Sequence, residues 1–393
     1  MKSKTMVTLG IEEFVAYPPS NLKGKRLGLL CNQASTDSRI RHSRDLVASA
    51  FPGQLTCLFT PQHGFFCEKQ DNMIESGHMR DKATGLPVFS LYGETRKPTE
   101  KMFDHLDVLL IDIVDVGTRV YTFMYTLAYC LEQAARFGKK VVVLDRPNPI
   151  GGDLIEGNLV DDDLRSFVGL YPIPMRHGLT FGELGLLFND HFKIKADYEV
   201  IRMTGWQREM THDDTGLPWI FPSPNMPTPA TAAVYPGQVI WEGTNISEGR
   251  GTTLPFELFG APFIDPEKLL HNIDKSLLEG CYLRPISFLP TANKWQGEDC
   301  RGFHIHVTDK NAFRPYRVSL ALLQAIMNLY PEDFALKQPP YEYEFEKLPL
   351  DLILGSQGVR MALAEGVAVA EVEESWQDDL REFGEIRKSC FLY

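Results

Sequence analysis

The sequence lacks the short motifs by which many enzymes hold a phosphate, a catalytic metal or a nucleophilic serine. No Gly-x-Gly-x-x-Gly loop follows the first apolar run, and no Walker lysine loop, His-Glu-x-x-His helix or Gly-x-Ser-x-Gly elbow occurs. These absences argue against a zinc protease and a serine hydrolase. They also argue against a nucleotide-binding Rossmann enzyme, which we keep as an alternative that fails if NAD or ATP does not raise the melting temperature.

Positive charge and long apolar runs are also scarce. The net charge of −12 argues against nucleic acid as a partner, because phosphate binding needs a basic face. No apolar run reaches membrane-spanning length, and no signal-peptide core follows the first residues. We therefore expect a cytoplasmic protein as the chain stands, or a periplasmic or secreted one if a signal peptide was removed.

Cysteines are few and form no recognisable framework. The seven cysteines are odd in number and scattered, which indicates free thiols in a reducing compartment. Cys57, His63 and Cys67 match no compact zinc spacing. We therefore expect neither a metal nor a cofactor.

The first half of the chain does have a repeated pattern of strand-length apolar runs that alternate with helical stretches. Near-continuous apolar runs are typical of parallel strands covered on both faces. Between the last two runs, residues 121–137 have helical spacing and stop before Gly138. The sequence predicts an α/β fold with a Rossmann-like, doubly wound parallel sheet. The apolar runs cover residues 26–31, 55–59, 88–91, 108–113 and 141–145.

The second half of the chain has a different pattern of predicted helices and strands, which indicates a smaller α+β domain. We expect a Rossmann-like catalytic domain over residues 1–262 and an auxiliary domain over residues 263–393. Before the boundary, Thr180 and Glu183 have capping-box spacing, and the proline-rich residues 222–236 indicate extended chain. Other expected elements are a strand over 198–203, helices over 265–280, 317–330 and 357–365, and a strand over 302–308.

One loop-like segment, Trp241 to Thr253, concentrates polar groups. It contains Glu242, Asn245, Glu248, Arg250 and three glycines, and it follows a short apolar run that we expect to be a strand. Convergent polar groups at a strand end are how α/β enzymes build sites at the edge of a sheet. The alternative is a hydrated, glycine-rich surface turn.

The other expected strands also end in polar residues. Because the carboxyl ends of parallel strands meet at one edge of a sheet, we expect a ligand cleft there, although each residue alone could be a turn or helix cap. The residues are Asn32, Gln62, His63, Asp112, Asp115, Arg119, Tyr121, Asp145, Arg146 and Asn148.

What remains after the exclusions is a set of carboxylates without a nucleophilic serine. Paired carboxylates in a cleft are the tools of glycoside hydrolysis, in which one protonates the leaving oxygen and the other acts as base, nucleophile or charge stabiliser. The candidates are Glu75, Glu94, Glu156, Glu242, Glu248, Asp112, Asp115 and Asp145.

Several longer motifs carry a family resemblance over nearly the whole chain. They cover residues 22–29, 84–88, 91–93, 112–119, 144–149, 176–180, 222–228 and 242–253. In these motifs the chain resembles the exo-β-N-acetylmuramidases, a bacterial glycoside hydrolase family once known only as a domain of unknown function. The resemblance implies a Rossmann-like active-site domain and a smaller auxiliary domain. It also implies release of N-acetylmuramic acid from the non-reducing ends of peptidoglycan fragments, in cell-wall recycling.

The chain departs from this family at one important position. The family usually has Pro-Glu-His-Gly where this chain has Pro61-Gln62-His63-Gly64, and that glutamate is a proposed catalytic residue. Three interpretations follow. The chain is a catalytically impaired muropeptide-binding paralogue, or another carboxylate such as Glu75 or Glu242 is the acid, or the sugar's acetamido group is the nucleophile and Gln62 orients it.

We expect a glycosidase whose partner is a peptidoglycan-derived sugar or muropeptide, and we leave the oligomeric state open. Arg119, Arg146 and Arg250 can hold the lactyl carboxylate by bidentate bonds. The expected catalytic group is Glu75, Glu242, Glu248, Gln62 and His63. The expected substrate-binding group is Asn32, Asp112, Asp115, Arg119, Tyr121, Asp145, Arg146, Asn148, Asn225, Asn245 and Arg250.

Overall fold

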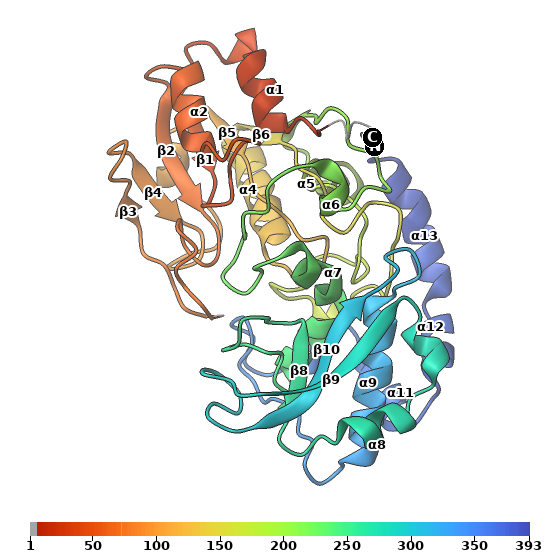
Figure 1. The fold of residues 1–393 in the computed structure, drawn as a ribbon. Coiled ribbons are helices and arrows are strands. Elements are labelled where there is room, and N and C mark those ends of the chain that lie inside the picture. The colour runs from red at the N-terminus through yellow and green to blue at the C-terminus, as the bar shows by residue number, and fades with distance from the viewer. Residues whose placement is uncertain (1–5, 72) are drawn as a thin grey trace.

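The computed structural model describes residues 6–71 and 73–393 and consists of a larger α/β part and a smaller part beside it (Figure 1). The larger part contains a seven-stranded sheet in the order β3-β4-β2-β1-β5-β6-β7. Neighbouring strands are parallel except for β3, which is antiparallel to β4. The predicted α/β class and parallel sheet are therefore confirmed. The strands are β1 (Leu27–Leu30), β2 (Leu55–Thr60), β3 (Met79–Arg80), β4 (Pro87–Ser90), β5 (Val108–Ile111), β6 (Lys140–Leu144) and β7 (Asp197–Ile201).

Both faces of this sheet are buried, which explains the continuous apolar runs. Leu29 and Leu110 belong to an apolar cluster on one face, whereas Leu30 and Ile111 belong to a cluster on the other. Successive strand residues point to opposite faces, so a strand that is covered twice needs apolar residues at every position. Helices α1 (Gly10–Ala16) and α2 (Ser43–Ala50) cover the first face, and α3 (Glu100–Phe103), α4 (Phe123–Phe137) and α5 (Phe181–Leu186) cover the second.

Helix ends in this part follow the sequence signals. Helix α4 stops at Gly138, whose φ of 62° is the left-handed conformation that glycine adopts without strain. Helix α5 begins at the predicted capping box, in which Glu183 N–H donates to Thr180 Oγ1 at 3.2 Å and Thr180 N–H donates to Glu183 Oε2 at 3.0 Å. Glu183 is therefore a structural cap.

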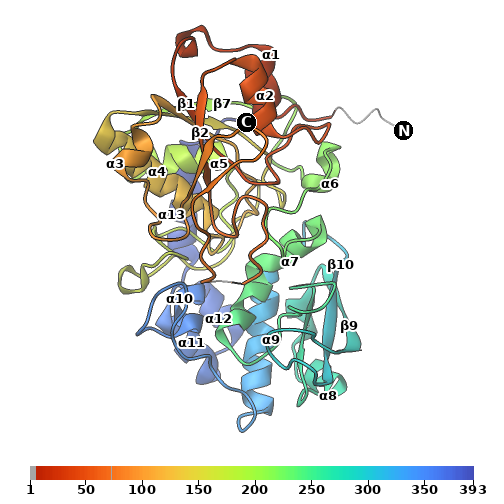
Figure 2. The ribbon, with the colours of Figure 1, turned by 90° about the vertical axis from the view of Figure 1, so that its left-hand side faces the viewer.

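The smaller part contains an antiparallel sheet in the order β8-β10-β9, packed against helices (Figure 2). Its strands are β8 (Leu258–Ala261), β9 (Cys281–Phe288) and β10 (Cys300–Val307). The boundary at residue 262 stays a prediction, although β8 precedes it in the chain. The helices are α7 (Pro229–Gln238), α8 (Pro266–His271), α9 (Pro315–Leu329), α10 (Pro349–Leu354), α11 (Gln357–Ala364) and α12 (Val369–Glu374).

The C-terminal helix α13 (Gln377–Lys388) returns to the larger part (Figure 1). Arg387 Nη1 donates to Gly152 O at 2.8 Å, and the hydroxyl of Tyr393 donates to Asp145 Oδ2 at 2.8 Å. The end of the chain therefore ties the smaller part to the sheet. No helix within the described ranges is long and apolar enough to cross a membrane.

Three expectations about local structure are wrong. Residues 229–236 of the segment expected as extended chain instead belong to α7, because the Thr228 hydroxyl caps the Thr231 N–H and Pro229 takes the first helical position. The apolar run before Glu242 ends α7 and continues as a 3₁₀ turn, η4 (Val239–Gly243), because a short buried run does not distinguish strand from helix. The helix expected to reach residue 280 ends at His271, where Asp274 caps a separate turn. The remaining short elements are η1 (Ser20–Leu22), η2 (Asp162–Leu164), η3 (Leu187–His191), η5 (Lys275–Leu278) and α6 (His212–Thr215).

Candidate active site

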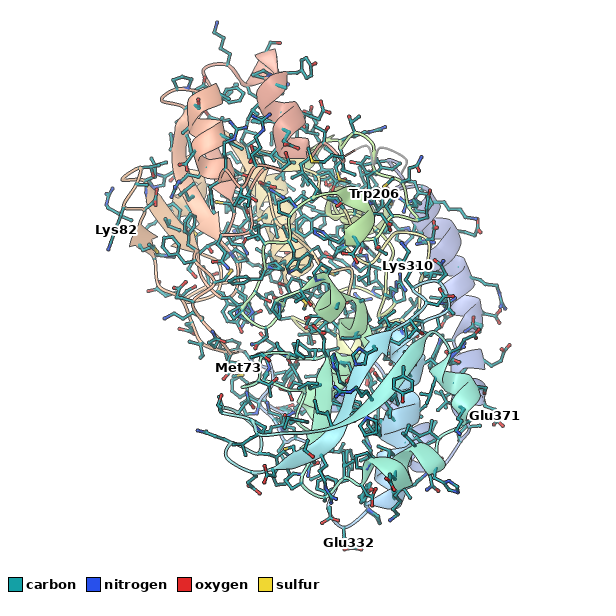
Figure 3. All side chains as sticks on the ribbon, viewed as in Figure 1. Met73, Lys82, Trp206, Lys310, Glu332 and Glu371 are labelled. Carbon is teal, nitrogen blue, oxygen red and sulfur yellow. The ribbon has the colours of Figure 1, made fainter. Side chains whose placement is uncertain are left out.

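A small cavity of about 40 Å³ lies where the two parts meet. The loop after β2 reaches the smaller part here, and Figure 3 places Met73 of that loop at the junction. The cavity therefore lies beyond the carboxyl end of the sheet and is closed by residues of the smaller part. Its polar lining consists of Gln62, His63, Tyr121, Thr122, Ser223, Asn225, Tyr235, Glu242, Arg250, Tyr341 and Glu342.

Glu242 is held as an anion at the wall of this cavity. Arg250 Nη2 donates to Glu242 Oε1 at 2.6 Å, and the Tyr341 hydroxyl donates to Oε2 at 2.7 Å. Burial opposes ionisation of this carboxyl, but the charge of Arg250 and the two hydrogen bonds outweigh it and hold the pKa of Glu242 below the ordinary value. Glu242 therefore presents negative charge to the cavity at neutral pH.

Glu248 lies deeper, at the wall of an adjoining cavity that shares Glu242 and Arg250. Its Oε1 lies 3.1 Å from Arg250 Nε and its Oε2 lies 2.7 Å from Lys294 Nζ. The same ammonium donates to the carbonyl oxygens of Trp241 and Ile246. Both oxygens of Glu248 thus contact cations that also hold the 241–250 segment in place. This arrangement suits a role for Glu248 in positioning Arg250.

The second carboxyl group of the cavity belongs to Glu342. Gln62 Nε2 donates to Glu342 Oε1 at 3.0 Å, and the Tyr92 hydroxyl donates to Oε2 at 2.7 Å. The Thr122 hydroxyl donates to Gln62 Oε1 at 2.5 Å, which orients the amide so that its NH₂ group faces Glu342. Burial is the largest effect on the pKa of Glu342 and raises it. The hydrogen bonds from Tyr92 and Gln62 lower the pKa by less, the negative charge of Glu242 adds a smaller increase, and Arg96 opposes it weakly.

Glu342 reaches the cavity from a tight turn. Tyr341 and Glu344 exchange backbone hydrogen bonds of 2.9 Å in both directions, with Glu342 and Tyr343 between them. Both central residues have positive φ, 47° and 66°, a conformation normally left to glycine or asparagine. Each costs on the order of 1 kcal/mol, and such strain persists where surrounding contacts impose it, often at functional sites.

His63 follows Gln62 and also lines the cavity. Lys69 O lies 2.7 Å from His63 Nδ1 and can only accept a hydrogen bond, so Nδ1 carries the proton. Burial lowers the pKa of His63 to about 4, so the ring is neutral above that pH. His63 Nε2 can then accept a hydrogen bond.

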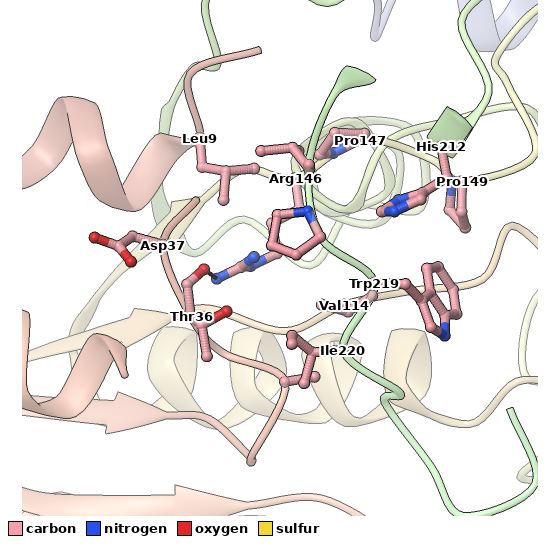
Figure 4. Close-up of a pocket in the computed structure, with 13 residues that line it drawn as sticks. Leu9, Thr36, Asp37, Val114, Arg146, Pro147, Pro149, His212, Trp219 and Ile220 are labelled. Carbon is pink, nitrogen blue, oxygen red and sulfur yellow. Dashed lines mark hydrogen bonds between the residues drawn. The ribbon is translucent and has the colours of Figure 1, made fainter. Parts of the chain in front are cut away.

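A separate pocket lies at the sheet edge where polar strand ends were expected to form the cleft (Figure 4). There Arg146 Nη2 donates to Asp112 Oδ2 at 2.8 Å and to Thr36 O at 2.7 Å. Asp112 also accepts a hydrogen bond from the Ser43 hydroxyl. The charged groups in this region are therefore satisfied by one another and by the backbone.

Other expected site residues lie outside the cavity and have structural partners. Arg119 is 0% exposed and donates to the carbonyl oxygens of Ile353 at 2.7 Å and Asn158 at 2.9 Å. Glu75 is exposed, with its Oε1 3.4 Å from the Tyr343 hydroxyl. A substrate role for these residues stays a prediction that the geometry does not support. The remainder of this group, each with hydrogen bonds to backbone or side chains, is Asn32, Asp115, Asp145, Asn148 and Asn245.

Several residues of the site escaped the sequence analysis, above all Glu342. The Tyr-Glu-Tyr-Glu run after two prolines was a visible signal, but its partner Gln62 lies 280 positions earlier in the chain. No periodicity or spacing connects such residues. The other missed residues are Tyr92, Thr122, Ser223, Tyr235, Lys294, Lys337 and Tyr341.

Two family models together match most of the chain. The N-terminal model of the exo-β-N-acetylmuramidase NamZ matches residues 27–230, and its C-terminal model matches residues 233–393. The chain belongs to the NamZ family. It is also 44% identical, over 99% of its length and 92% of the relative, to the peptidoglycan β-N-acetylmuramidase NamZ of Bacillus subtilis strain 168.

Solved structures agree with this membership of the NamZ family. A DUF1343 family protein from Bacteroides fragilis NCTC 9343 has a TM-score of 0.89 and 34% identity, with all of both chains covered. A second DUF1343 family protein from the same organism has a TM-score of 0.74 and 28% identity, with 99% of both chains covered. In this NamZ-family chain the cavity takes Gln62 and His63 from the N-terminal region, and Glu242 and Glu342 from the C-terminal region.

Proposed function

We propose that this protein is an exo-acting glycosidase that releases N-acetylmuramic acid from the non-reducing ends of peptidoglycan fragments. The observation that carries the proposal is the pair of buried carboxyl groups, Glu242 and Glu342, at one cavity. Glycoside hydrolysis needs two carboxyl groups in different protonation states at one sugar, and pKa values pushed apart by the surroundings mark such pairs. Family membership supports the same activity.

Glu242 is the anionic partner in this proposal. Its negative charge faces the position where an oxocarbenium-like transition state develops positive charge, and Arg250 and Tyr341 hold it in place. The neutral His63 and the half-buried Asn225 line the same cavity and offer hydrogen bonds to sugar hydroxyl and acetamido groups.

The lactyl carboxylate of muramic acid needs a cation, and the structure offers two near Glu242. Arg250 is engaged by Glu242 and Glu248. Lys337 is exposed, lines the adjoining cavity, and forms no ion pair with any described residue. Lys337 is therefore the more available partner for the lactyl group, with Arg250 fixing Glu242.

The state of the cysteines supports a proposal for the compartment. All seven cysteines are free and six of them are buried, which suits a reducing environment. We infer that the enzyme acts in the cytoplasm on imported cell-wall fragments.

The test is product release from N-acetylmuramic acid β-linked to N-acetylglucosamine and from 4-nitrophenyl N-acetyl-β-muramide. We expect turnover of both substrates, and none of a fragment that lacks N-acetylmuramic acid at its non-reducing end. Calorimetric binding of the disaccharide without release of either sugar would instead identify a muropeptide-binding protein.

A further inference from the structure

The turn at residues 341–344 holds a buried carboxyl group against the residue that replaces the family's catalytic glutamate. Gln62 stands where the family resemblance places that glutamate, and its amide nitrogen lies 3.0 Å from Glu342 Oε1. Glu342 is 4% exposed and shares the cavity with Glu242. A carboxyl group is thus present at this place in the site, although position 62 no longer supplies one.

The hydrogen-bond partners of Glu342 lower the pKa of its carboxyl by less than burial raises it, because neither partner carries a positive charge. The Gln62 amide and the Tyr92 hydroxyl are neutral, and in the described part of the chain they are the groups within hydrogen-bond distance of this carboxyl. The Gln62 NH₂ group can donate to a protonated or an ionised carboxyl. A glutamate at position 62 would instead compete for the same proton, because two carboxyl groups in contact cannot both ionise readily.

Strain in the backbone adds a second, independent argument. Glu342 and Tyr343 keep positive φ in the turn, and contacts outside the turn hold them there. Arg96 packs over the Tyr343 ring at 4.0 Å from its centroid, and Tyr92 and Gln62 hold the Glu342 side chain. Strained non-glycine residues persist where the surroundings impose them, and here they aim a carboxyl group into the cavity.

We propose that Glu342 is the general acid of this enzyme and that Gln62 is a positioning residue for it. The proton on the Glu342 carboxyl passes to the glycosidic oxygen as the bond from that oxygen to the anomeric carbon breaks. The bonding electron pair stays with the oxygen, which leaves as a sugar hydroxyl. Water then adds its oxygen to the anomeric carbon and gives up the proton that restores the acid. The pKa of Glu342 is raised because burial outweighs the lowering by Tyr92, Gln62 and Arg96, and Glu242 adds to the rise, which supports this assignment.

The assignment of Glu342 rests on the proposed function. A comparison of two leaving groups distinguishes failure of this assignment from failure of the proposed function. A sugar hydroxyl leaves only when protonated, whereas 4-nitrophenolate leaves without a proton. We expect Glu342→Gln to lower kcat/KM for the disaccharide by about 100-fold or more, the usual range for loss of a general acid, and for 4-nitrophenyl N-acetyl-β-muramide by less than about fivefold. Glu346→Gln, an exposed carboxyl on the same loop, is the matched control and changes neither.

Each outcome has one meaning. Selective loss on the disaccharide supports Glu342 as the acid. An equal loss on both substrates, or no loss on either, overturns it while leaving the hydrolase in place. A parent protein that cleaves neither substrate overturns the proposed function itself.

A second measurement covers the case in which Glu342→Gln does not fold. Gln62→Glu places a carboxyl group in contact with Glu342, so the alkaline limb of kcat/KM for the disaccharide moves to higher pH if Glu342 carries the catalytic proton. An unchanged limb in a folded Gln62→Glu protein overturns the proposal. A role for Gln62 in stability alone would alter the melting temperature and leave the pH profile where it was.

Discussion

The pocket at the sheet edge and the cavity between the two parts both contain buried charged residues, but they satisfy them differently. At the sheet edge, Arg146 is matched by the Asp112 carboxylate and by a backbone carbonyl. In the cavity, Glu242 is matched by Arg250, whereas the groups that hydrogen-bond Glu342 within the described residues are neutral. The charges at the sheet edge are paired in direct contact, whereas Glu342 in the cavity has Arg96 only at longer range.

This difference distinguishes a charge pair that stabilises the fold from a carboxyl group that is suited to catalysis. A buried carboxylate with a full cationic partner holds elements together, because removal of either charge leaves the other buried and unpaired. A buried carboxyl that has no cation in contact keeps its proton to higher pH, because burial then outweighs the hydrogen bonds from neutral donors, and it can give the proton away. The two kinds of site predict different results for mutations.

The largest expected effect is on catalysis at the cavity. Glu242→Gln removes the anion that Arg250 and Tyr341 hold, so kcat/KM should fall on the order of 10³-fold for both the disaccharide and the nitrophenyl substrate. The assay is initial-rate kinetics, with Glu346→Gln as the unchanged control and circular dichroism to check folding. A folded Glu242→Gln enzyme within tenfold of the parent would remove Glu242 from the mechanism.

At the sheet edge the effect should fall on stability instead. Arg146→Met leaves the Asp112 carboxylate buried without its cation, so the free energy of unfolding should drop by about 3–5 kcal/mol in urea titrations. The kcat/KM of the folded protein should stay within about threefold of the parent, on the reasoning that the guanidinium reaches no part of the cavity. A rise in KM for muramyl substrates without a loss of stability would make Arg146 a substrate ligand and would break the comparison.

Most of the fold was predictable because its signals are local. The apolar runs at β1, β2, β4, β5 and β6 reflect a sheet covered on both faces, and Gly138 and the Thr180–Glu183 capping box mark helix ends. The α7–η4 region was missed because proline and short apolar runs fit both extended and helical chain.

The site was only half predictable, for a geometric reason. Gln62, His63, Glu242 and Arg250 each lie in a segment whose composition is unusual by itself. A role for Glu342 can be recognised only from its contacts with Gln62 and Tyr92, which are 280 and 250 positions away in the chain. The strand-end rule pointed to the edge of the sheet beyond which the cavity lies, but it could not distinguish paired charges from available ones.

The pH dependence of activity tests the difference between Glu242 and Glu342. On each side of the pH optimum, kcat/KM should fall by about tenfold. The proposed mechanism requires that Glu242 is ionised and that Glu342 is protonated. Arg250 outweighs burial and lowers the pKa of Glu242, so kcat/KM rises with pH through a value below that of an ordinary glutamate. Burial and Glu242 raise the pKa of Glu342, opposed by Tyr92, Gln62 and Arg96, so kcat/KM falls with pH above the ordinary value.

A comparison of two substrates shows which limb of the pH profile reports the general acid. The alkaline limb should be present for the disaccharide and absent for 4-nitrophenyl N-acetyl-β-muramide, which needs no proton on its leaving group. An alkaline limb of equal size for both substrates would belong to binding and not to an acid. Because Glu242 and Glu342 interact, the fitted values describe the pair.

The smallest expected effect is on recognition of the lactyl group by Lys337. This side chain is exposed at the adjoining cavity, so a single ion pair there contributes up to about 1 kcal/mol, equal to about a three- to fivefold change in KM. Lys337→Ala should raise KM for the muramide by that factor and leave KM for the matching N-acetylglucosaminide, which has no lactyl carboxylate, unchanged. Added salt should shrink the difference, because exposed charges are screened. Lys388→Ala on α13 is the control for loss of a surface charge. An equal rise in KM for both sugars would mean that Lys337 shapes the cavity without contacting the carboxylate, and Arg250 would then have to serve both Glu242 and the substrate.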